Sequence, residues 1–161
     1  MPNYLQGDIF AANDERNTDL AIIFGHVGLN SMGFFWRKFV ETAPHFFHIR
    51  DPFTELSGQP ISFTDRRWLW FFPAADNHGM PDAQFASAFK QALTWAQANG
   101  LRTIITNGIR DIDHGINSVE NRRSDDRRTK FIGEIAADHE RATGVDITLI
   151  SLNDAFVRGS G

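Results

Sequence analysis

Glycines and small polar residues follow a short apolar run near the start of the chain. The segment GHVGLNSMG (25–33) comes directly after LAIIF (20–24) and before an aromatic stretch that we expect to be helical. Glycines between a strand and a helix let backbone N–H groups approach an anion, and a helix N-terminus favours negative charge. The segment therefore predicts a phosphate-containing ligand, with a tight turn that uses glycine for positive φ as the alternative.

The same segment lacks two common nucleotide motifs but contains a candidate nucleophile. Neither G-x-x-x-x-G-K-[ST] nor G-x-G-x-x-G occurs in the chain, which excludes a P-loop and a dinucleotide-binding fingerprint. Ser31, followed by Met32 and Gly33, is similar to half of the nucleophile elbow G-x-S-x-G, although Leu29 stands in place of the first glycine. A serine hydrolase acting through Ser31 is therefore one alternative function.

A charged segment is the second candidate for chemistry. RDIDHG (110–115) contains Asp111, Asp113 and His114, which could transfer protons or ligate a metal ion. Single Asp and His residues in loops more often serve turns or helix caps, and there is no H-E-x-x-H, so we expect no metal and no cofactor. ENRRSDDRRTK (120–130) mixes both charges, which favours a solvated face with salt bridges over a phosphate-binding arm.

Composition limits the class of protein. The chain has 161 residues, 42% hydrophobic and 22% charged, and we expect one domain over 1–158 with a flexible tail at 159–161. A net charge of −4 predicts no general attraction to nucleic acid or to a membrane surface. The absence of cysteine excludes disulfides and thiolate chemistry. A soluble, cytoplasmic protein is therefore expected.

Strand and helix patterns alternate along the chain. Strands are expected over 4–10, 20–24, 61–73 (one or two strands), 101–106 and 145–152, with a further short strand at HFFHI (45–49). Helices are expected over 32–43, 82–100 and 129–143. This order predicts an α/β fold with three layers, α/β/α, and a mixed, mostly parallel sheet. Ligands of such sheets bind beyond the carboxyl ends of the strands.

The clearest helix pattern lies in 82–100. One apolar stripe repeats at intervals of four, four and three residues: Phe85, Phe89, Ala92 and Ala96. Asp82 is expected to cap its N-terminus and Gly100 to follow its C-cap. His139 falls on the apolar stripe of the last helix and is expected to be a hydrogen-bonded core histidine.

One family resemblance spans nearly the whole chain. Gly7-Asp8-Ile9 matches the Gly-Asp-Ile element near the start of macrodomains. The segment 25–44 resembles the macrodomain segment that contains a Met-Gly pair and ends at a proline. RTIITNGIRDIDHGINS (102–118) occupies the place of the second phosphate-binding loop of the family. The chain therefore resembles a divergent macrodomain.

The resemblance implies a site for ADP-ribose or an ADP-ribosylated macromolecule. Asp8 would accept a hydrogen bond from the adenine amino group, the backbone near Ile9 would help to read the base, and Phe156 would stack near it. The first loop would wrap the distal ribose and one phosphate with residues that include His26, Gly28, Ser31, Met32 and Gly33. The second loop would close on the diphosphate with Asn107, Gly108 and Ile109.

The resemblance also implies hydrolysis of an ADP-ribosyl linkage. Asn30 would position the ribose, because Gly28 stands where the family usually has asparagine. Asp111 or Asp113 would activate water, and His26 or His114 would move a proton. A non-catalytic interaction module is the alternative, with its pocket filled by Phe34, Phe35 and neighbouring aromatic residues.

Overall fold

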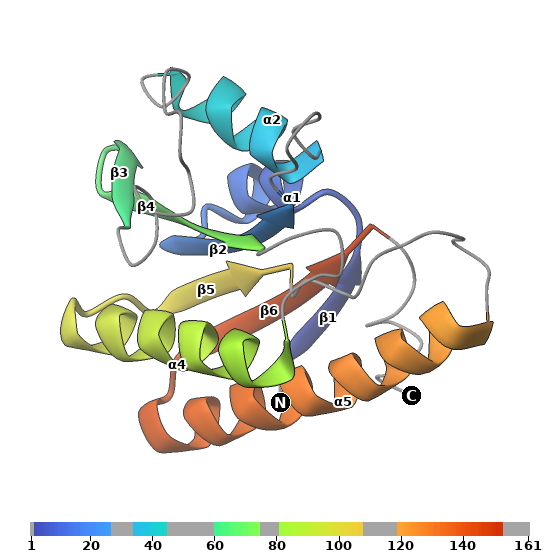
Figure 1. The fold of residues 1–161 in the computed structure, drawn as a ribbon. Coiled ribbons are helices and arrows are strands. Elements are labelled where there is room, and N and C mark those ends of the chain that lie inside the picture. Colours follow the sequence, from blue (N-terminus) through green and yellow to red (C-terminus); the bar gives the residue numbers. More distant parts are fainter. Residues whose placement is uncertain (1, 27–33, 45–59, 75–80, 108–118, 153–161) are drawn as a thin grey trace.

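A computed structural model describes residues 2–26, 34–44, 60–74, 81–107 and 119–152 of the chain. A six-stranded sheet lies at the centre, in the order β1-β6-β5-β2-β4-β3 (Figure 1). The strands are β1 (Asn3–Gln6), β2 (Leu20–His26), β3 (Ile61–Thr64), β4 (Arg67–Ala74), β5 (Thr103–Thr106) and β6 (Asp146–Ser151). Only β3 runs antiparallel to its neighbour within the described residues, so the predicted mixed, mostly parallel sheet is confirmed.

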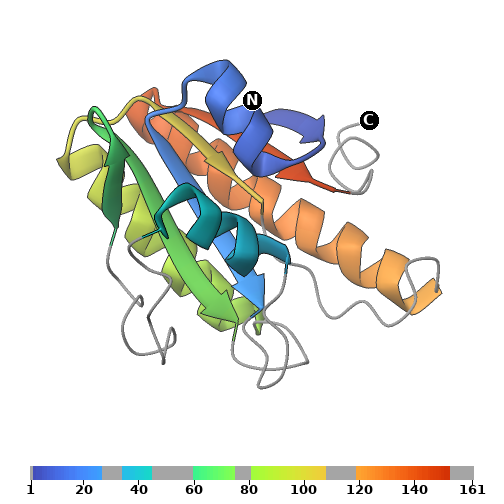
Figure 2. The same cartoon turned by 90° about the horizontal axis from the view of Figure 1, so that it is seen from above.

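Helices cover both faces of this sheet. On one face lie α1 (Ile9–Arg16) and α2 (Phe34–Thr42), and on the other lie α4 (Asp82–Ala98) and α5 (Val119–Thr143) (Figures 1 and 2). Alternate side chains of β2 serve the two layers: Ile22 and Phe24 pack with α4 and α5, whereas Ala21 and Ile23 pack with α1 and α2. Burial on both faces explains why LAIIF is a continuous apolar run, and the three-layer prediction is confirmed.

The predicted strand over 4–10 is wrong in its second half. The strand ends at Gln6 and helix α1 begins at Ile9. Asp8 is the N-cap of this helix, and its Oδ1 atom accepts a hydrogen bond of 3.0 Å from the backbone N–H of Phe10. Asn17, with a φ of 52°, ends the helix in the left-handed conformation. The polar residues Asn13 to Arg16 therefore belong to α1.

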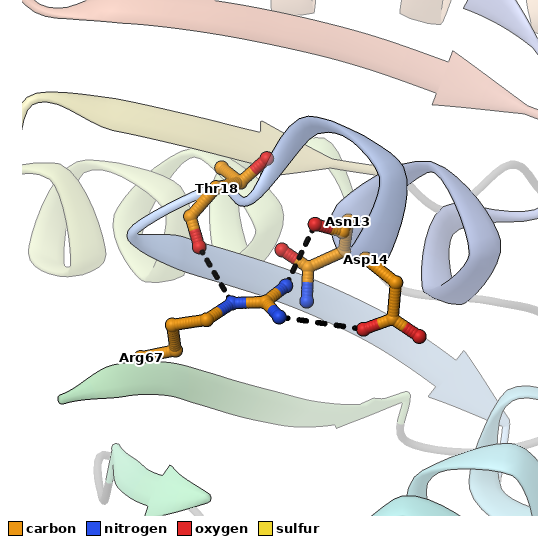
Figure 3. A network of polar contacts seen from close by, with 4 residues as sticks. All are labelled: Asn13, Asp14, Thr18 and Arg67. Atoms are coloured by element: carbon orange, nitrogen blue, oxygen red, sulfur yellow. Dashed lines mark hydrogen bonds and ion pairs between the residues drawn. The ribbon is translucent and has the colours of Figure 1, made fainter. Parts of the chain in front are cut away.

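Arg67 ties the start of β4 to the end of α1 (Figure 3). Its guanidinium donates hydrogen bonds to the carbonyl oxygens of Asn13, at 2.6 Å, and Thr18, at 3.3 Å. A third nitrogen lies 3.4 Å from the carboxylate of Asp14. The guanidinium carbon also lies 5.1 Å from the centre of the Phe63 ring. One side chain thus satisfies carbonyls at the helix end and holds α1 against the sheet.

Helix α4 follows its predicted stripe, but its cap differs. Pro81, not Asp82, occupies the N-cap position, and it makes no side-chain cap bond. Asp82 is instead the first helical residue, where its charge favours the helix dipole. Gly100, with a φ of +72°, follows the C-cap as predicted. The four residues of the apolar stripe are buried.

Helix α5 begins ten residues before the predicted start, at Val119 rather than 129. The residues added at its start, 119–128, are mostly polar, so no apolar stripe predicted them as a helix. Arg127 in this part lies 3.6 Å from Asp82 of α4, consistent with the predicted salt-bridged face. The helix continues through Gly133, which leaves room for Tyr4 of β1: a Cβ at this position would lie 3.0 Å from the Tyr4 hydroxyl oxygen. The predicted strand at 45–49 lies outside the described residues.

Candidate functional site

The connections of β2 mark the carboxyl edge of the sheet as the edge where a ligand is expected. β2 leads to α2 on one face, whereas its two neighbours, β4 and β5, lead to α4 and α5 on the opposite face (Figure 2). Adjacent strands whose connections turn to opposite faces leave a crevice beyond their carboxyl ends, where open α/β sheets bind ligands. This arrangement holds for β2 with β4 and also for β2 with β5. The strand order thus indicates the carboxyl edge of the sheet, the same edge that the sequence analysis predicted for ligand binding.

Asp8 lies at this edge, at the carboxyl end of β1. The preceding residue, Gly7, has a φ of +152° and donates its backbone N–H to the carbonyl oxygen of Ser151 at 2.8 Å. This bond anchors the turn from β1 into α1 to the end of β6. Asp8 is half-buried, and one of its carboxylate oxygens accepts the N–H of Phe10. The capping bond therefore fixes the direction of the carboxylate.

The side chain and the backbone N–H of Ile9 have different surroundings. Its side chain is 1% exposed and belongs to the core beneath α1 and α2. As the first residue of α1, its backbone N–H has no carbonyl partner within the helix. A carboxylate acceptor at Asp8 and a backbone donor at Ile9 thus stand next to each other. That the backbone near Ile9 would help to read a base stays a prediction.

Gly25 near the end of β2 has a packing role. A Cβ built on it would lie 2.9 Å from Cε2 of Phe71 and 3.0 Å from Cβ of Phe35. The missing side chain lets the first turn of α2 approach the strand closely. At this position glycine serves close helix–strand packing, and no positive φ is involved. The packing sets where α2 begins relative to the end of β2.

Phe35 belongs to the core of the α1 and α2 layer. Its side chain is half-buried and packs against the cluster that includes Trp36, Phe39 and Phe71. Phe35 is one of the two phenylalanines that the alternative interpretation placed in a filled pocket, and its half-buried side chain packs against this core cluster. The side chain of Phe34 lies outside the described residues.

Asn107 is buried at the carboxyl end of β5. It is 3% exposed, its Oδ1 atom accepts the backbone N–H of Phe24 at 2.8 Å, and its Nδ2 atom donates to the Phe24 carbonyl oxygen at 2.8 Å. Sequence reasoning placed Asn107 in the second loop as a ligand contact and missed its partner. The sequence held little information on this pairing. An asparagine directly after a buried strand was the one local indication, and Phe24 is 83 positions away.

Most other predicted site residues lie outside the described residues and stay predictions. In the first loop these are Gly28, Asn30, Ser31, Met32 and Gly33. In the second loop and the C-terminal segment they are Gly108, Ile109, Asp111, Asp113, His114 and Phe156. The backbone of His26 is described: it is the last residue of β2 and pairs with Ala74 of β4.

His139 differs from its prediction as a hydrogen-bonded core histidine. Its Nε2 atom is buried and has no hydrogen-bond partner among the residues that the structure describes. Burial lowers its pKa from the ordinary value of 6.5, and the nearby carboxylate of Glu140 opposes this shift. In those same parts of the chain, no group of three or more His, Asp or Glu residues could hold a metal ion.

None of the helices described is both long and apolar enough to cross a lipid bilayer.

Comparison with solved structures identifies the fold as that of a macrodomain. The macrodomain of Mycobacterium tuberculosis DarG matches with a TM-score of 0.60 at 10% sequence identity, over 94% of this chain and 97% of that one. A mutant of the Oceanobacillus iheyensis macrodomain matches with a TM-score of 0.56 at 15% identity, over 98% and 87%. The macrodomain of Thermus aquaticus DarG gives 0.52 at 11% identity, over 94% and 97%.

No family model matches the sequence, and no curated protein matches it.

Proposed function

We propose that this chain, which has the macrodomain fold, binds ADP-ribose or a closely related nucleoside diphosphate at the carboxyl edge of its sheet. The observation that carries this proposal is the position of Asp8. Asp8 is half-buried, and its oriented carboxylate stands beside the first backbone N–H of α1, at the carboxyl edge of the sheet. In the macrodomain family, which the sequence resembles, the aspartate of the Gly-Asp-Ile element binds adenine.

The donor and acceptor at this place suit the edge of adenine. An ionised carboxylate has about four acceptor positions, so the bond to Phe10 leaves Asp8 able to accept from the adenine amino group. The N–H of Ile9 would donate to the neighbouring ring nitrogen. Hypoxanthine and guanine carry a carbonyl oxygen in place of that amino group, and it would face the carboxylate unfavourably. The site should therefore prefer adenine nucleotides.

The diphosphate would lie beyond the ends of β2 and β5. The sequence places glycine-containing segments directly after both strands, at 27–33 and 108–118. Backbone N–H groups of such segments bind phosphate without a basic side chain, and this chain carries a net charge of −4. The first segment would also hold the distal ribose, with Asn30 as the positioning side chain.

Titration of the purified chain with ADP-ribose tests binding. We expect micromolar affinity in calorimetry and a rise in melting temperature, because ligand at 100 times its dissociation constant stabilises the folded state by about 2.7 kcal/mol. The inosine analogue should bind at least about 10-fold more weakly. The absence of any response to ADP-ribose would contradict the proposal and favour the interaction module with a filled pocket.

Substitution of Asp8 tests the residue that carries the proposal. Asp8→Asn keeps a good N-cap, so the protein should fold. If the amide oxygen accepts the N–H of Phe10, the amide nitrogen faces the adenine amino group, donor against donor. We expect ADP-ribose affinity to fall by about 10-fold or more. Asp14→Asn, a change at an exposed carboxylate of the same helix, is the matched control and should bind normally.

Hydrolysis of an ADP-ribosyl linkage is the catalytic form of this proposal. The oxygen of a water molecule would bond to ribose C1″ as the bond to the leaving group breaks. Asp111 or Asp113 would take the proton of the water, and His26 or His114 would return a proton to the leaving group. Mass spectrometry should detect ADP-ribose released from modified protein or nucleic acid, and Asp111→Asn or Asp113→Asn should abolish release while binding persists.

Two results would favour other functions. Tight binding of ADP-ribose without release from any modified substrate would indicate a binding module. Covalent labelling by a fluorophosphonate that is lost in Ser31→Ala would indicate a serine hydrolase.

A further inference from the structure

Strand β5 ends its pairing with β2 before β2 itself ends. The register joins Leu20 to Ile104 and Ile22 to Thr106, and among the residues that the structure describes no later pair joins these two strands. On its other side β2 stays paired with β4 as far as His26. The N–H and C=O of Phe24 face the β5 side at a point that β5 no longer reaches as a strand. Two buried backbone groups therefore need another partner.

The carboxamide of Asn107 supplies both partners. Its oxygen accepts the N–H of Phe24, and its nitrogen donates to the C=O of the same residue, each at 2.8 Å. A carboxamide has the donor and acceptor of a peptide group, so it occupies the place that the peptide groups of a longer β5 would take. The N–H and C=O of Phe24 thereby stay hydrogen-bonded although β5 ends as a strand at Thr106.

We propose that Asn107 is a positioning residue for the ADP-ribose site, which sets the separation of β2 and β5 at the edge where the diphosphate would bind. This inference rests on the proposed function. Asn107 is 3% exposed and both ends of its amide are occupied, so it acts through the backbone of Phe24 rather than by touching the ligand. It links the carboxyl ends of two neighbouring strands whose connections turn to opposite faces of the sheet.

The chemistry of the pairing dictates which substitutions preserve it. Leucine is similar in size but offers neither donor nor acceptor. An ionised aspartate offers two acceptors, so it would pair with the N–H of Phe24 and repel the C=O. A protonated aspartate again has one donor and one acceptor on a planar group of the same size. Asn107→Asp should therefore restore the native pairing when it is protonated, and burial raises the pKa of such a carboxyl.

The experiment measures ADP-ribose affinity of folded protein by calorimetry at low temperature, between about pH 8 and about pH 5. Circular dichroism establishes that each variant is folded at each pH. We expect Asn107→Leu to bind about 10-fold more weakly or worse at every pH. Asn107→Asp should be as weak at the high end and recover toward the wild-type affinity at the low end.

Thr106→Val is the matched control at the same strand end. Thr106 is fully buried, and its hydroxyl has no hydrogen-bond partner among the described residues. This variant should bind like the wild type across the pH range. A residue that contributed only to stability would leave the affinity of the folded fraction unchanged, so the recovery of affinity at low pH distinguishes a positioning role.

Each result decides between the two proposals. If the wild type binds and both Asn107 variants, when folded, bind within 2-fold of it, the positioning role is wrong and the proposed function stands. If the wild type does not bind, the proposed function is wrong and the positioning role falls with it. If Asn107→Leu does not fold, Asn107→Asp carries the test, because it retains both hydrogen bonds when protonated. Failure of Asn107→Asp to fold or to regain affinity at low pH overturns the inference.

Discussion

Gly25 and Phe35 are packed so closely that a side chain on the glycine would collide with the first turn of α2. A Cβ at position 25 would lie 3.0 Å from Cβ of Phe35, and 2.9 Å from the ring of Phe71 on the neighbouring strand. Cβ of Phe35 is fixed by the helix backbone and cannot rotate away. The end of β2 and the start of α2 are therefore held at a distance that only glycine permits.

Gly25→Ala should destabilise the protein and displace α2. Overpacking of this kind costs about 1–3 kcal/mol in the free energy of unfolding, which urea denaturation measures. ADP-ribose affinity should fall as well, because the segment between β2 and α2 is proposed to hold the ribose. Phe71→Leu removes one of the two obstacles, so the double variant should lose less than the sum of the single changes. A fully additive loss would contradict the close packing.

Arg67 should be hard to replace, even by lysine. Its side chain is 19% exposed and donates to two backbone carbonyls at the end of α1. A lysine ammonium is a point charge without the planar fork of arginine, so Arg67→Lys should cost about 1 kcal/mol and Arg67→Met about 2 kcal/mol. Arg66→Lys, at the exposed neighbouring position, is the control and should be neutral. Equal stability of Arg67→Met and wild type would exclude a stabilising role for these hydrogen bonds.

The hairpin between β3 and β4 carries backbone strain that a substitution should relieve. Its two loop residues, Asp65 and Arg66, have φ values of 31° and 84°, both in the left-handed region that favours glycine. Arg66→Gly should raise the free energy of unfolding by about 0.5–1 kcal/mol, the gain being limited by the greater freedom of glycine in the unfolded chain. Arg66→Ala retains a Cβ and should show no such gain in the same denaturation experiment.

His139 should make stability depend on pH in one direction. Burial lowers its pKa below the ordinary 6.5, so the unfolded chain binds a proton at a higher pH than the folded chain does. The stability that the neutral His139 side chain contributes to the fold is therefore fully present above about pH 6.5. It is lost as the pH falls through the lower pKa that His139 has in the folded state. The difference in unfolding free energy between wild type and His139→Gln should change between about pH 7 and pH 5. Lys130→Gln on the same helix should show no such change.

The sequence by itself determined the layers of this protein, because periodicity reports burial locally. The run LAIIF indicated a strand covered on both faces, and β2 has helices on each side. The stripe in α4 was correctly predicted for the same reason. Local sequence patterns did not predict where helices α1 and α5 begin. Asp8 caps a helix where an extended strand was expected, because the apolar residues around it suit either structure and the capping bond decided between them.

Only the tertiary structure decided how the candidate site is built. The order of strands makes β2 the place where connections turn to opposite faces, and no local pattern encodes that order. Asn107 pairs with Phe24, and Gly25 packs against Phe71, through contacts between segments far apart in the chain. Such contacts depend on which strands become neighbours, whereas the sequence shows only what each segment can bury. The amide of Asn107 therefore looked available for a ligand until the sheet placed a strand beside it.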